Sequence, residues 1–181
     1  MAELPNATRP VVIGLAGWSG SGKTTLALRL IAACKARGLR VATLKHAHHQ
    51  FDVDVPGKDS YRHREAGAEQ VIVASNQRIA VMIEAPLPDP QDRRPLRDLL
   101  PLVRDVDVVL VEGFKTEDHP KIEVFRPENG KDRLANTSPT ILAVASPGAA
   151  TQDAGRMALD LDQPESWLTE VLDAFANWPW P

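Results

Sequence analysis

The sequence predicts an α/β fold with a mostly parallel central sheet flanked by helices. This prediction rests on the alternation of segment types along the chain and on the length and composition of the chain. Short, strongly apolar runs typical of buried strands alternate with segments whose apolar residues recur at helical spacing, and glycines and prolines separate these segments. With 181 residues and 43% hydrophobic side chains, the chain has the length of one ordinary domain and enough apolar material for a core.

The first three elements are expected within residues 11–45. Residues 11–16 are nearly all apolar and include two adjacent valines, which favours a buried strand. A helix is expected from Lys23 onward, and Gly38 provides its end. Residues 39–45 form a second strand-like run, so these elements predict a βαβ unit with a parallel strand pair and a right-handed crossover.

The middle of the chain predicts a loop, a short helix and a hairpin. Residues 46–60 are polar and contain a Pro-Gly pair, which predicts the loop. Two short apolar runs flank residues 75–78, a spacing that favours an antiparallel hairpin and hence a mixed sheet. The other expected elements are a helix over 59–66, a proline-rich connection over 86–95, a helix over 96–103, strands over 106–113, 121–126 and 140–146, and a helix over 166–175.

Composition and charge exclude several classes of protein. A net charge of −3 argues against a general nucleic-acid binder, because phosphate backbones attract a basic face. No apolar run is long enough to cross a bilayer, and the first ten residues lack the apolar segment of a signal peptide. The one cysteine, Cys34, cannot form an internal disulfide. We therefore expect a cytoplasmic protein that binds neither nucleic acid nor membrane.

The turn between the first strand and the first helix, "GWSGSGKT", matches G-x-x-x-x-G-K-[ST] at every fixed position. Its glycines let successive backbone N–H groups converge on phosphate oxygens, and the helix N-terminus adds its own. Lys23 is expected to reach the β- and γ-phosphates, Thr24 to ligate Mg²⁺ and Thr25 to contact the α-phosphate. The turn therefore predicts a P-loop NTPase fold. The predicted nucleotide-binding residues of this loop are Gly17, Ser19, Gly20, Ser21, Gly22, Lys23, Thr24 and Thr25.

A Rossmann dinucleotide site is the competing interpretation of this turn, and the sequence argues against it. The G-x-G-x-x-G spacing is absent, and Lys45 and His46 stand where an acidic residue is needed at the end of the second strand. A P-loop also needs a carboxylate near the metal. Glu112 follows four apolar residues, so it is expected at the carboxyl end of a central strand, beside the P-loop. It is the candidate catalytic residue and metal ligand; the alternative is a charged residue that merely ends a strand.

Three blocks of sequence carry a resemblance to a known family: "WSGSGKTT", then "KHAHH…FDVDVPGKDSY…AGA…VIVAS", then "LVEGFK…KIEVFR". Together with their spacing, from about residue 11 to residue 146, they resemble the molybdopterin-guanine dinucleotide biosynthesis protein B family, MobB. The resemblance implies a GTP-binding accessory protein of molybdenum-cofactor assembly. It implies a homodimer that works beside the molybdenum cofactor guanylyltransferase, which joins GMP to molybdopterin, and at most slow GTP hydrolysis.

The loop over residues 46–60 is the second candidate site, because ligands bind at the carboxyl ends of strands in open α/β sheets. Asp52 and Asp54 are candidates for the Mg²⁺ shell, with turn formation as the alternative. Basic residues around the loop are candidates for a second anion, such as the phosphate of a bound molybdopterin. These residues are Lys45, His46, Lys58 and Arg62, and a solvated surface is the alternative for the last two.

Several questions stay open at the level of sequence. The N-K-x-D box that reads guanine in many GTPases is absent, so the choice of GTP rests on the resemblance, and residues 143–148 are the candidate base pocket. A small-molecule kinase is one alternative, although its arginine lid would have to come from Arg93-Arg94. A metal-insertion GTPase is another, suggested by His46, His48 and His49. The expected organisation is a flexible N-terminus over residues 1–10, a P-loop nucleotide-binding domain over 11–176 and an irregular tail over 177–181.

Overall fold

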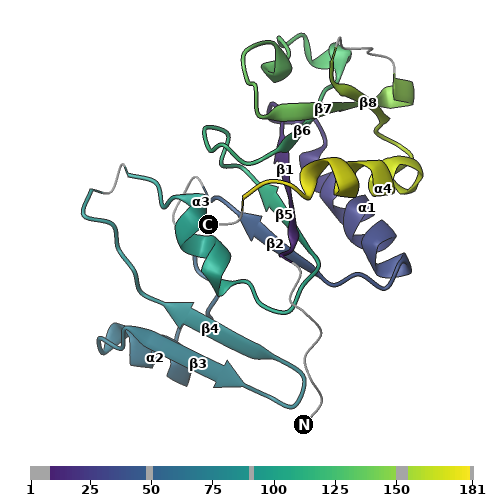
Figure 1. Ribbon diagram of the computed structural model, residues 1–181. Coiled ribbons are helices and arrows are strands. Elements are labelled where there is room, and N and C mark those ends of the chain that lie inside the picture. The colour runs from purple at the N-terminus through teal and green to yellow at the C-terminus, as the bar shows by residue number, and fades with distance from the viewer. Residues whose placement is uncertain (1–8, 48–50, 90–91, 150–154, 180–181) are drawn as a thin grey trace. The chain divides into compact units, whose positions relative to one another are not determined.

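The computed structural model describes residues 9–47, 51–89, 92–149 and 155–179 (Figure 1). The chain forms two compact units: residues 1–46 together with 95–181 make up the first, and residues 47–94 make up the second. The domain boundaries predicted at residues 11 and 176 stay predictions, and most of the predicted N-terminal segment lies outside the described residues. No helix in the described ranges combines the length and apolar character that a membrane span requires.

The first unit is built on a six-stranded sheet in which every pairing is parallel, so the predicted α/β class is confirmed. Its central strands are almost completely buried, as expected where both faces of a parallel sheet are covered. In spatial order the strands are β2 (Val41–Lys45), β5 (Val108–Glu112), β1 (Val11–Ala16), β6 (Lys121–Val124), β7 (Ile141–Ser146) and β8 (Met157–Asp160).

The predicted pairing of β1 with β2 is wrong, although the two strands do run parallel. The most continuously apolar strand, β5, lies between them and pairs with both, so that Val108 is opposite Val11 on one side and Val41 on the other. This arrangement buries β5 on both faces, which its run of four aliphatic residues favours. The order therefore follows from a strand that lies far away in the sequence.

Two longer helices, α1 (Lys23–Ala36) and α4 (Pro164–Phe175), pack against each other and against one face of the sheet (Figure 1). Cys34 is buried in this core, and burial raises the pKa of its thiol, as expected for a packing residue. On the other face, Val12, Val109 and Val111 pack with α3 (Leu96–Leu99) and the turn Leu100–Leu102 that follows it.

The sequence also missed one strand and misjudged one helix. Among the described residues, the edge strand β8 pairs with β7 alone, and no strand was predicted there because its short segment carries no long apolar run. The helix predicted over residues 96–103 is a single turn, α3, followed by a 3₁₀ turn that contains Pro101.

The second unit contains α2 (Asp59–Glu65), which packs on β3 (Gln70–Ala74), and β4 (Ile79–Ile83), which pairs with β3. The predicted hairpin is confirmed, but the predicted mixed sheet is wrong: β3 and β4 form a separate two-stranded sheet. A four-residue connection lets the two strands satisfy each other's hydrogen bonds locally. The hairpin therefore needs no edge of the larger sheet.

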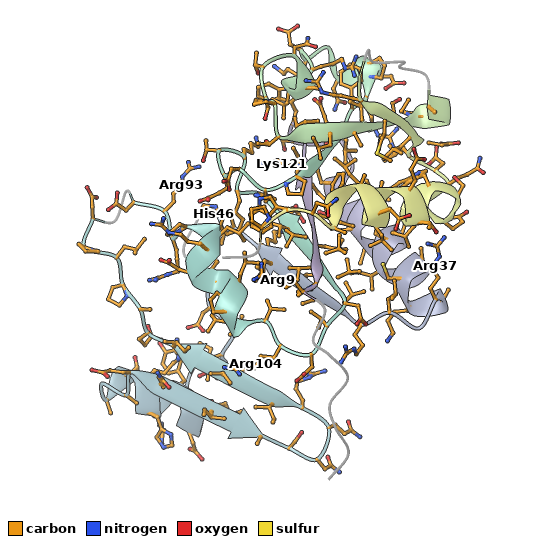
Figure 2. All side chains as sticks on the ribbon, viewed as in Figure 1. Arg9, Arg37, His46, Arg93, Arg104 and Lys121 are labelled. Carbon is orange, nitrogen blue, oxygen red and sulfur yellow. The ribbon has the colours of Figure 1, made fainter. Side chains whose placement is uncertain are left out.

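A buried basic pair lies between β1 and the chain that leads into β6. A Cβ on Gly14 would lie 2.5 Å from His119 Nε2 and 2.7 Å from Lys121 Cγ, so only glycine leaves room for both side chains. Lys121 (Figure 2) donates hydrogen bonds to the Glu117 carbonyl, to the His119 carbonyl at 2.9 Å and to Thr140 Oγ1 at 2.9 Å. Burial lowers the pKa of Lys121 to about 8 and that of His119 to about 3.

The depressed pKa of His119 predicts a loss of stability in mild acid. Between the folded pKa of about 3 and an unfolded pKa of about 6.5, the unfolded state binds a proton that the folded state does not. Stability from this group is therefore present above pH 6.5 and falls as the pH falls, by about 2 kcal/mol between pH 7 and pH 5. We expect His119→Phe, which keeps a ring beside Trp178, to remove this part of the pH dependence in urea unfolding.

The exposed His63, changed to Phe, is the matched control and should leave the pH dependence as in the wild type. Equal losses of stability in the wild type and His119→Phe between pH 7 and pH 5 would contradict the assignment to His119.

Candidate nucleotide-binding site

The loop between β1 and α1 has the backbone that its glycines predict. Gly17, Gly20 and Gly22 have φ angles of 145°, 78° and 98°, all in the region that side chains disfavour. A Cβ on Gly17 would also lie 2.6 Å from Ser21 Oγ and 2.7 Å from the Val124 carbonyl oxygen. Gly22 is the N-cap of α1, so the first unpaired N–H groups of that helix lie at the end of the loop.

Lys23 lies across the beginning of the loop that it follows. Its Nζ donates hydrogen bonds to the Gly17 carbonyl at 3.1 Å and to the Trp18 carbonyl at 3.0 Å. Partial burial lowers the pKa of Lys23, and the positive charges of Lys115 and Lys45 act in the same direction, whereas Glu112 opposes them. Three ammonium groups around one loop make a basic site in a chain whose net charge is negative.

Glu112 is the last residue of β5, and its carboxylate meets the start of α1. Thr24 Oγ1 lies 3.4 Å from Glu112 Oε1 and 3.5 Å from Oε2, both within hydrogen-bond distance. Lys45 Nζ lies 4.0 Å from the same Oε1. The expected location of Glu112, at the carboxyl end of a central strand beside the P-loop, is therefore the observed one. A hydroxyl beside a carboxylate is a donor set of the kind that Mg²⁺ takes, while the catalytic role of Glu112 stays a prediction.

Two basic residues of the second candidate site also lie beside Glu112. The backbone N–H of His46 donates to the Glu112 carbonyl at 3.0 Å. The imidazole ring of His46 (Figure 2) meets the Phe114 ring edge-on, with 5.3 Å between the ring centres. A Cβ on Gly113 would lie 2.8 Å from His46 Cβ, so this approach requires glycine. Lys45 and His46 are thus held at the edge of the sheet that carries the P-loop.

The other four residues of the second candidate site belong to the second unit, so their predicted location beside the P-loop stays a prediction. Asp52 accepts a hydrogen bond from the Asp54 N–H at 2.9 Å, and Asp54 accepts one from Ser60 Oγ at 2.9 Å. Arg64, which the sequence did not single out, lies 2.7 Å from Asp52 and 3.5 Å from Asp54. The Asp54 N–H and then Arg64 lower the pKa of Asp52. These contacts fit turn formation.

Lys58 and Arg62 are exposed, and neither forms an ion pair within the described ranges. The histidines that suggested a metal-insertion GTPase include His48 and His49, which lie outside the described residues. Among the residues that are described, no group of three or more His, Cys, Asp and Glu side chains is arranged to hold a metal ion.

Two cationic residues near the loop were missed. Arg126 donates a hydrogen bond from Nε to the Ser21 carbonyl at 3.1 Å, and Lys115 Nζ lies 5.5 Å from the centre of the Trp18 ring. Trp18 in turn donates to the Asp132 carbonyl at 2.8 Å. The signal for Arg126 was available, because it is the last letter of "KIEVFR" and follows a strand at the edge where the P-loop lies.

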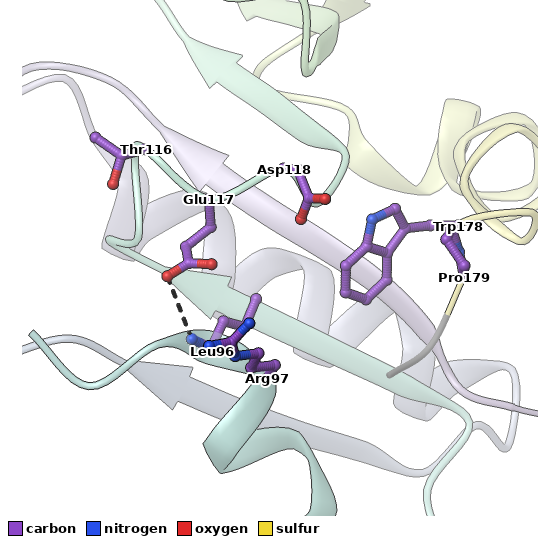
Figure 3. Close-up of a pocket in the computed structure, with 7 residues that line it drawn as sticks. All are labelled: Leu96, Arg97, Thr116, Glu117, Asp118, Trp178 and Pro179. Atoms are coloured by element: carbon purple, nitrogen blue, oxygen red, sulfur yellow. Dashed lines mark hydrogen bonds between the residues drawn. The ribbon is translucent and has the colours of Figure 1, made fainter.

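A cavity of about 400 Å³ lies in the first unit and contains none of the predicted site residues (Figure 3). On one wall, Glu117 Oε1 accepts a hydrogen bond from the Leu96 N–H at 3.4 Å. The ring of Trp178 on the opposite wall meets the buried His119 ring edge-on at 6.4 Å. The cavity is lined by Leu96, Arg97, Thr116, Glu117, Asp118, Trp178 and Pro179.

Residues 12–147 match the family described as "Molybdopterin guanine dinucleotide synthesis protein B", MobB. The chain belongs to this family. The resemblance carried by the three sequence blocks is therefore confirmed, and it extends over both units of the structure.

Named relatives agree with this assignment. The chain is 50% identical over 115 residues to the molybdopterin-guanine dinucleotide biosynthesis adapter protein of Escherichia coli K12, a match that covers 64% of this chain and 65% of that one, just under two thirds of its length. It is 41% identical over 167 residues to the protein of the same name from Haemophilus influenzae, covering 92% and 88%. The crystal structure of a MobB homolog from Bacillus stearothermophilus has a TM-score of 0.61 at 27% identity, covering 90% and 98%.

The contact between Thr24 and Glu112 predicts how triphosphate binding depends on Mg²⁺. Glu112→Gln keeps the size of the side chain and removes its charge, so the metal loses a negative ligand. We expect this variant to bind GTP with nearly the same affinity in Mg²⁺ and in EDTA, whereas the wild type binds more tightly in Mg²⁺. Calorimetric titration measures both affinities.

The control is Glu170→Gln, the same change at an exposed position on α4. A Glu112→Gln protein that keeps the full Mg²⁺ dependence of the wild type would rule out Glu112 as the acidic partner of the metal.

Proposed function

We propose that this protein is a GTP-binding adaptor of molybdenum-cofactor biosynthesis that assists the attachment of GMP to molybdopterin and hydrolyses GTP slowly at most. The observation that carries the proposal is the cluster of Lys23, Thr24 and Glu112 at the P-loop of a MobB-family chain. The family supports a role in molybdenum-cofactor biosynthesis, and the names of the E. coli and H. influenzae relatives support the role of an adaptor.

The residues of the loop fit a triphosphate with Mg²⁺. Ser21 Oγ is buried inside the loop and has no hydrogen-bond partner in the described part of the chain, so a phosphate oxygen can provide one. Lys23 donates to neutral carbonyls, and charged phosphate oxygens are stronger acceptors. Thr24 and Glu112 offer two oxygen ligands, and Mg²⁺ commonly takes one or two protein oxygens beside phosphates and water. When bound, the ion neutralises charge on the phosphates.

The same contacts support slow hydrolysis. A carboxylate that activates water must be available to accept a proton from it. Glu112 contacts the hydroxyl of Thr24 and lies 4.0 Å from the ammonium of Lys45, whose positive charge makes the carboxylate a weaker base. In this proposal GTP is bound and presented rather than rapidly consumed.

The second anion site belongs to the same proposal. Lys45 and His46 beside Glu112, with the exposed Lys58 and Arg62, are proposed to contact the phosphate of molybdopterin. The proposed partners are the molybdenum cofactor guanylyltransferase and the proteins that deliver molybdopterin. Asp52 and Asp54 stay a prediction as metal ligands, because both already have partners in their own unit.

We also propose that the protein is a homodimer, with one face of the β3–β4 sheet as part of the contact. Register places Ile72 opposite Val81, and both share a face with Ile79 and Ile83. These four side chains are between 45% and 70% exposed, an unusual aliphatic surface for a two-stranded sheet. A two-stranded sheet is marginally stable alone, and a symmetric contact would bury this face in both copies.

Reconstitution with the guanylyltransferase tests the adaptor function. We expect Lys23→Ala to lose tight GTP binding and the stimulation of guanine dinucleotide formation together, because it removes charge-assisted hydrogen bonds of about 1.5–3 kcal/mol each. Lys58→Ala combined with Arg62→Ala should lose part of the stimulation while GTP affinity stays within about twofold, since exposed charges contribute less than about 1 kcal/mol each. Full stimulation by Lys23→Ala would contradict the proposal.

Sedimentation velocity tests the dimer. Ile72→Lys with Val81→Lys puts two like charges into the proposed contact, and we expect a monomer under conditions where the wild type is a dimer. Leu28→Lys is the matched control, because Leu28 on α1 is as exposed as Ile72, at 64%. A wild-type monomer, or a dimer that survives both lysines, would contradict this interface.

A further inference from the structure

Arg126 lies against the P-loop from the side of β6. The residue follows β6 by two positions, and β6 is the neighbour of β1 on the side opposite β5. Its Nε donates a hydrogen bond to the Ser21 carbonyl at 3.1 Å. If Gly22 carried a Cβ, that atom would lie 3.7 Å from Arg126 Nε and 3.8 Å from one terminal nitrogen of Arg126. The guanidinium therefore packs against the backbone of the loop.

The remaining donors of this guanidinium are available for a ligand. An arginine has five N–H donors, and one of them is used by the Ser21 carbonyl. Within the described ranges, the two terminal nitrogens of Arg126 have neither a hydrogen-bond acceptor nor a carboxylate partner. The side chain is half-buried, and its position is fixed by the loop. Arg126 therefore presents a rigid pair of donors next to the nucleotide site.

Two arguments favour the nucleoside side of the loop over the phosphates as the place of these donors. A P-loop turns its N–H groups inward to the phosphates, so the Ser21 carbonyl that Arg126 contacts faces away from them. Thr24 and Glu112, which mark the metal and the terminal phosphates, lie on the β5 side of the loop, whereas Arg126 lies on the β6 side.

The end of β6 also runs beside the predicted base pocket. The Phe125 N–H donates to the Ala145 carbonyl at 2.9 Å, so Arg126 leaves the sheet next to the end of β7. The turn that follows β7, Pro147–Ala149, overlaps the segment over residues 143–148 in which the sequence locates the base.

We infer that Arg126 selects guanine by donating hydrogen bonds from its terminal nitrogens to O6 and N7 of the base. The inference rests on the proposed function, because it assumes a nucleoside triphosphate in the P-loop. A guanidinium only donates, and this edge of guanine offers two acceptors, whereas adenine has an amino donor in place of O6. Arg126 would supply the discrimination that a chain without an N-K-x-D box needs from another residue.

The test compares ligands that share the triphosphate and differ at the base edge. Calorimetry with GTP, ITP, 7-deaza-GTP, ATP and inorganic tripolyphosphate is run on the wild type, Arg126→Ala and Arg126→Lys. We expect Arg126→Ala to weaken GTP and ITP by about tenfold or more and to leave ATP and tripolyphosphate within about twofold. The wild type should prefer GTP to 7-deaza-GTP, which lacks N7, and both variants should lose that preference.

Tripolyphosphate reports whether the P-loop of each variant is intact. Arg37→Ala is the matched control, because Arg37 (Figure 2) also donates to a carbonyl, that of Glu165, but lies at the far end of α1. Equal losses for all five ligands would mean that Arg126 acts through the P-loop or the phosphates and not through the base, and would overturn the inference. Unchanged GTP affinity in Arg126→Ala would overturn it while leaving the proposed function standing. A wild type that binds no triphosphate would overturn both.

Discussion

Parallel alignment of β5 between β1 and β2 is the constraint on which the candidate site depends. Register sets Leu15 of β1 and Lys45 of β2 opposite Glu112, the last residue of β5. Parallel strands have their carboxyl ends on the same side of the sheet. The strand pairing alone therefore brings Glu112 and Lys45 close to the start of the P-loop. The location of Glu112 is therefore as rigid as the core that buries β5, and Thr24 needs only the first turn of α1 to reach it.

Close backbone approach is the second requirement, and glycine meets it at three positions: within β1, after β1 and after β5. Gly14 leaves room for the buried pair before β6, Gly17 lets the loop fold back on Ser21, and Gly113 lets the chain after β2 lie beside the end of β5. At the latter two positions φ is also positive, so conformation and space favour the same residue. At Gly17, a larger side chain would strain the phosphate loop directly, because it would meet Ser21 and the Val124 carbonyl.

The parts of this structure that depend on local sequence were predictable, and the parts that depend on distant pairing were not. The P-loop, the buried strands and the position of Glu112 follow from runs of apolar residues and from one motif. The place of β5 between β1 and β2 follows from contacts between segments far apart in the chain. For Arg126, the local sequence could indicate a basic residue at the end of a strand, but its partner Ser21 lies 105 positions away and could not be predicted.

The chain passes between the two units beside residues of the candidate site. The chain enters that unit at residue 47, directly after Lys45 and His46, and returns at residue 95, directly before α3. The backbone N–H of His46 donates to the Glu112 carbonyl, and Lys45 lies near the Glu112 carboxylate. The segment that leads into the second unit therefore starts beside Glu112, the proposed metal ligand. The residues that precede the second unit therefore belong to the surroundings of Glu112, and the charge of Lys45 also acts on Lys23 of the P-loop.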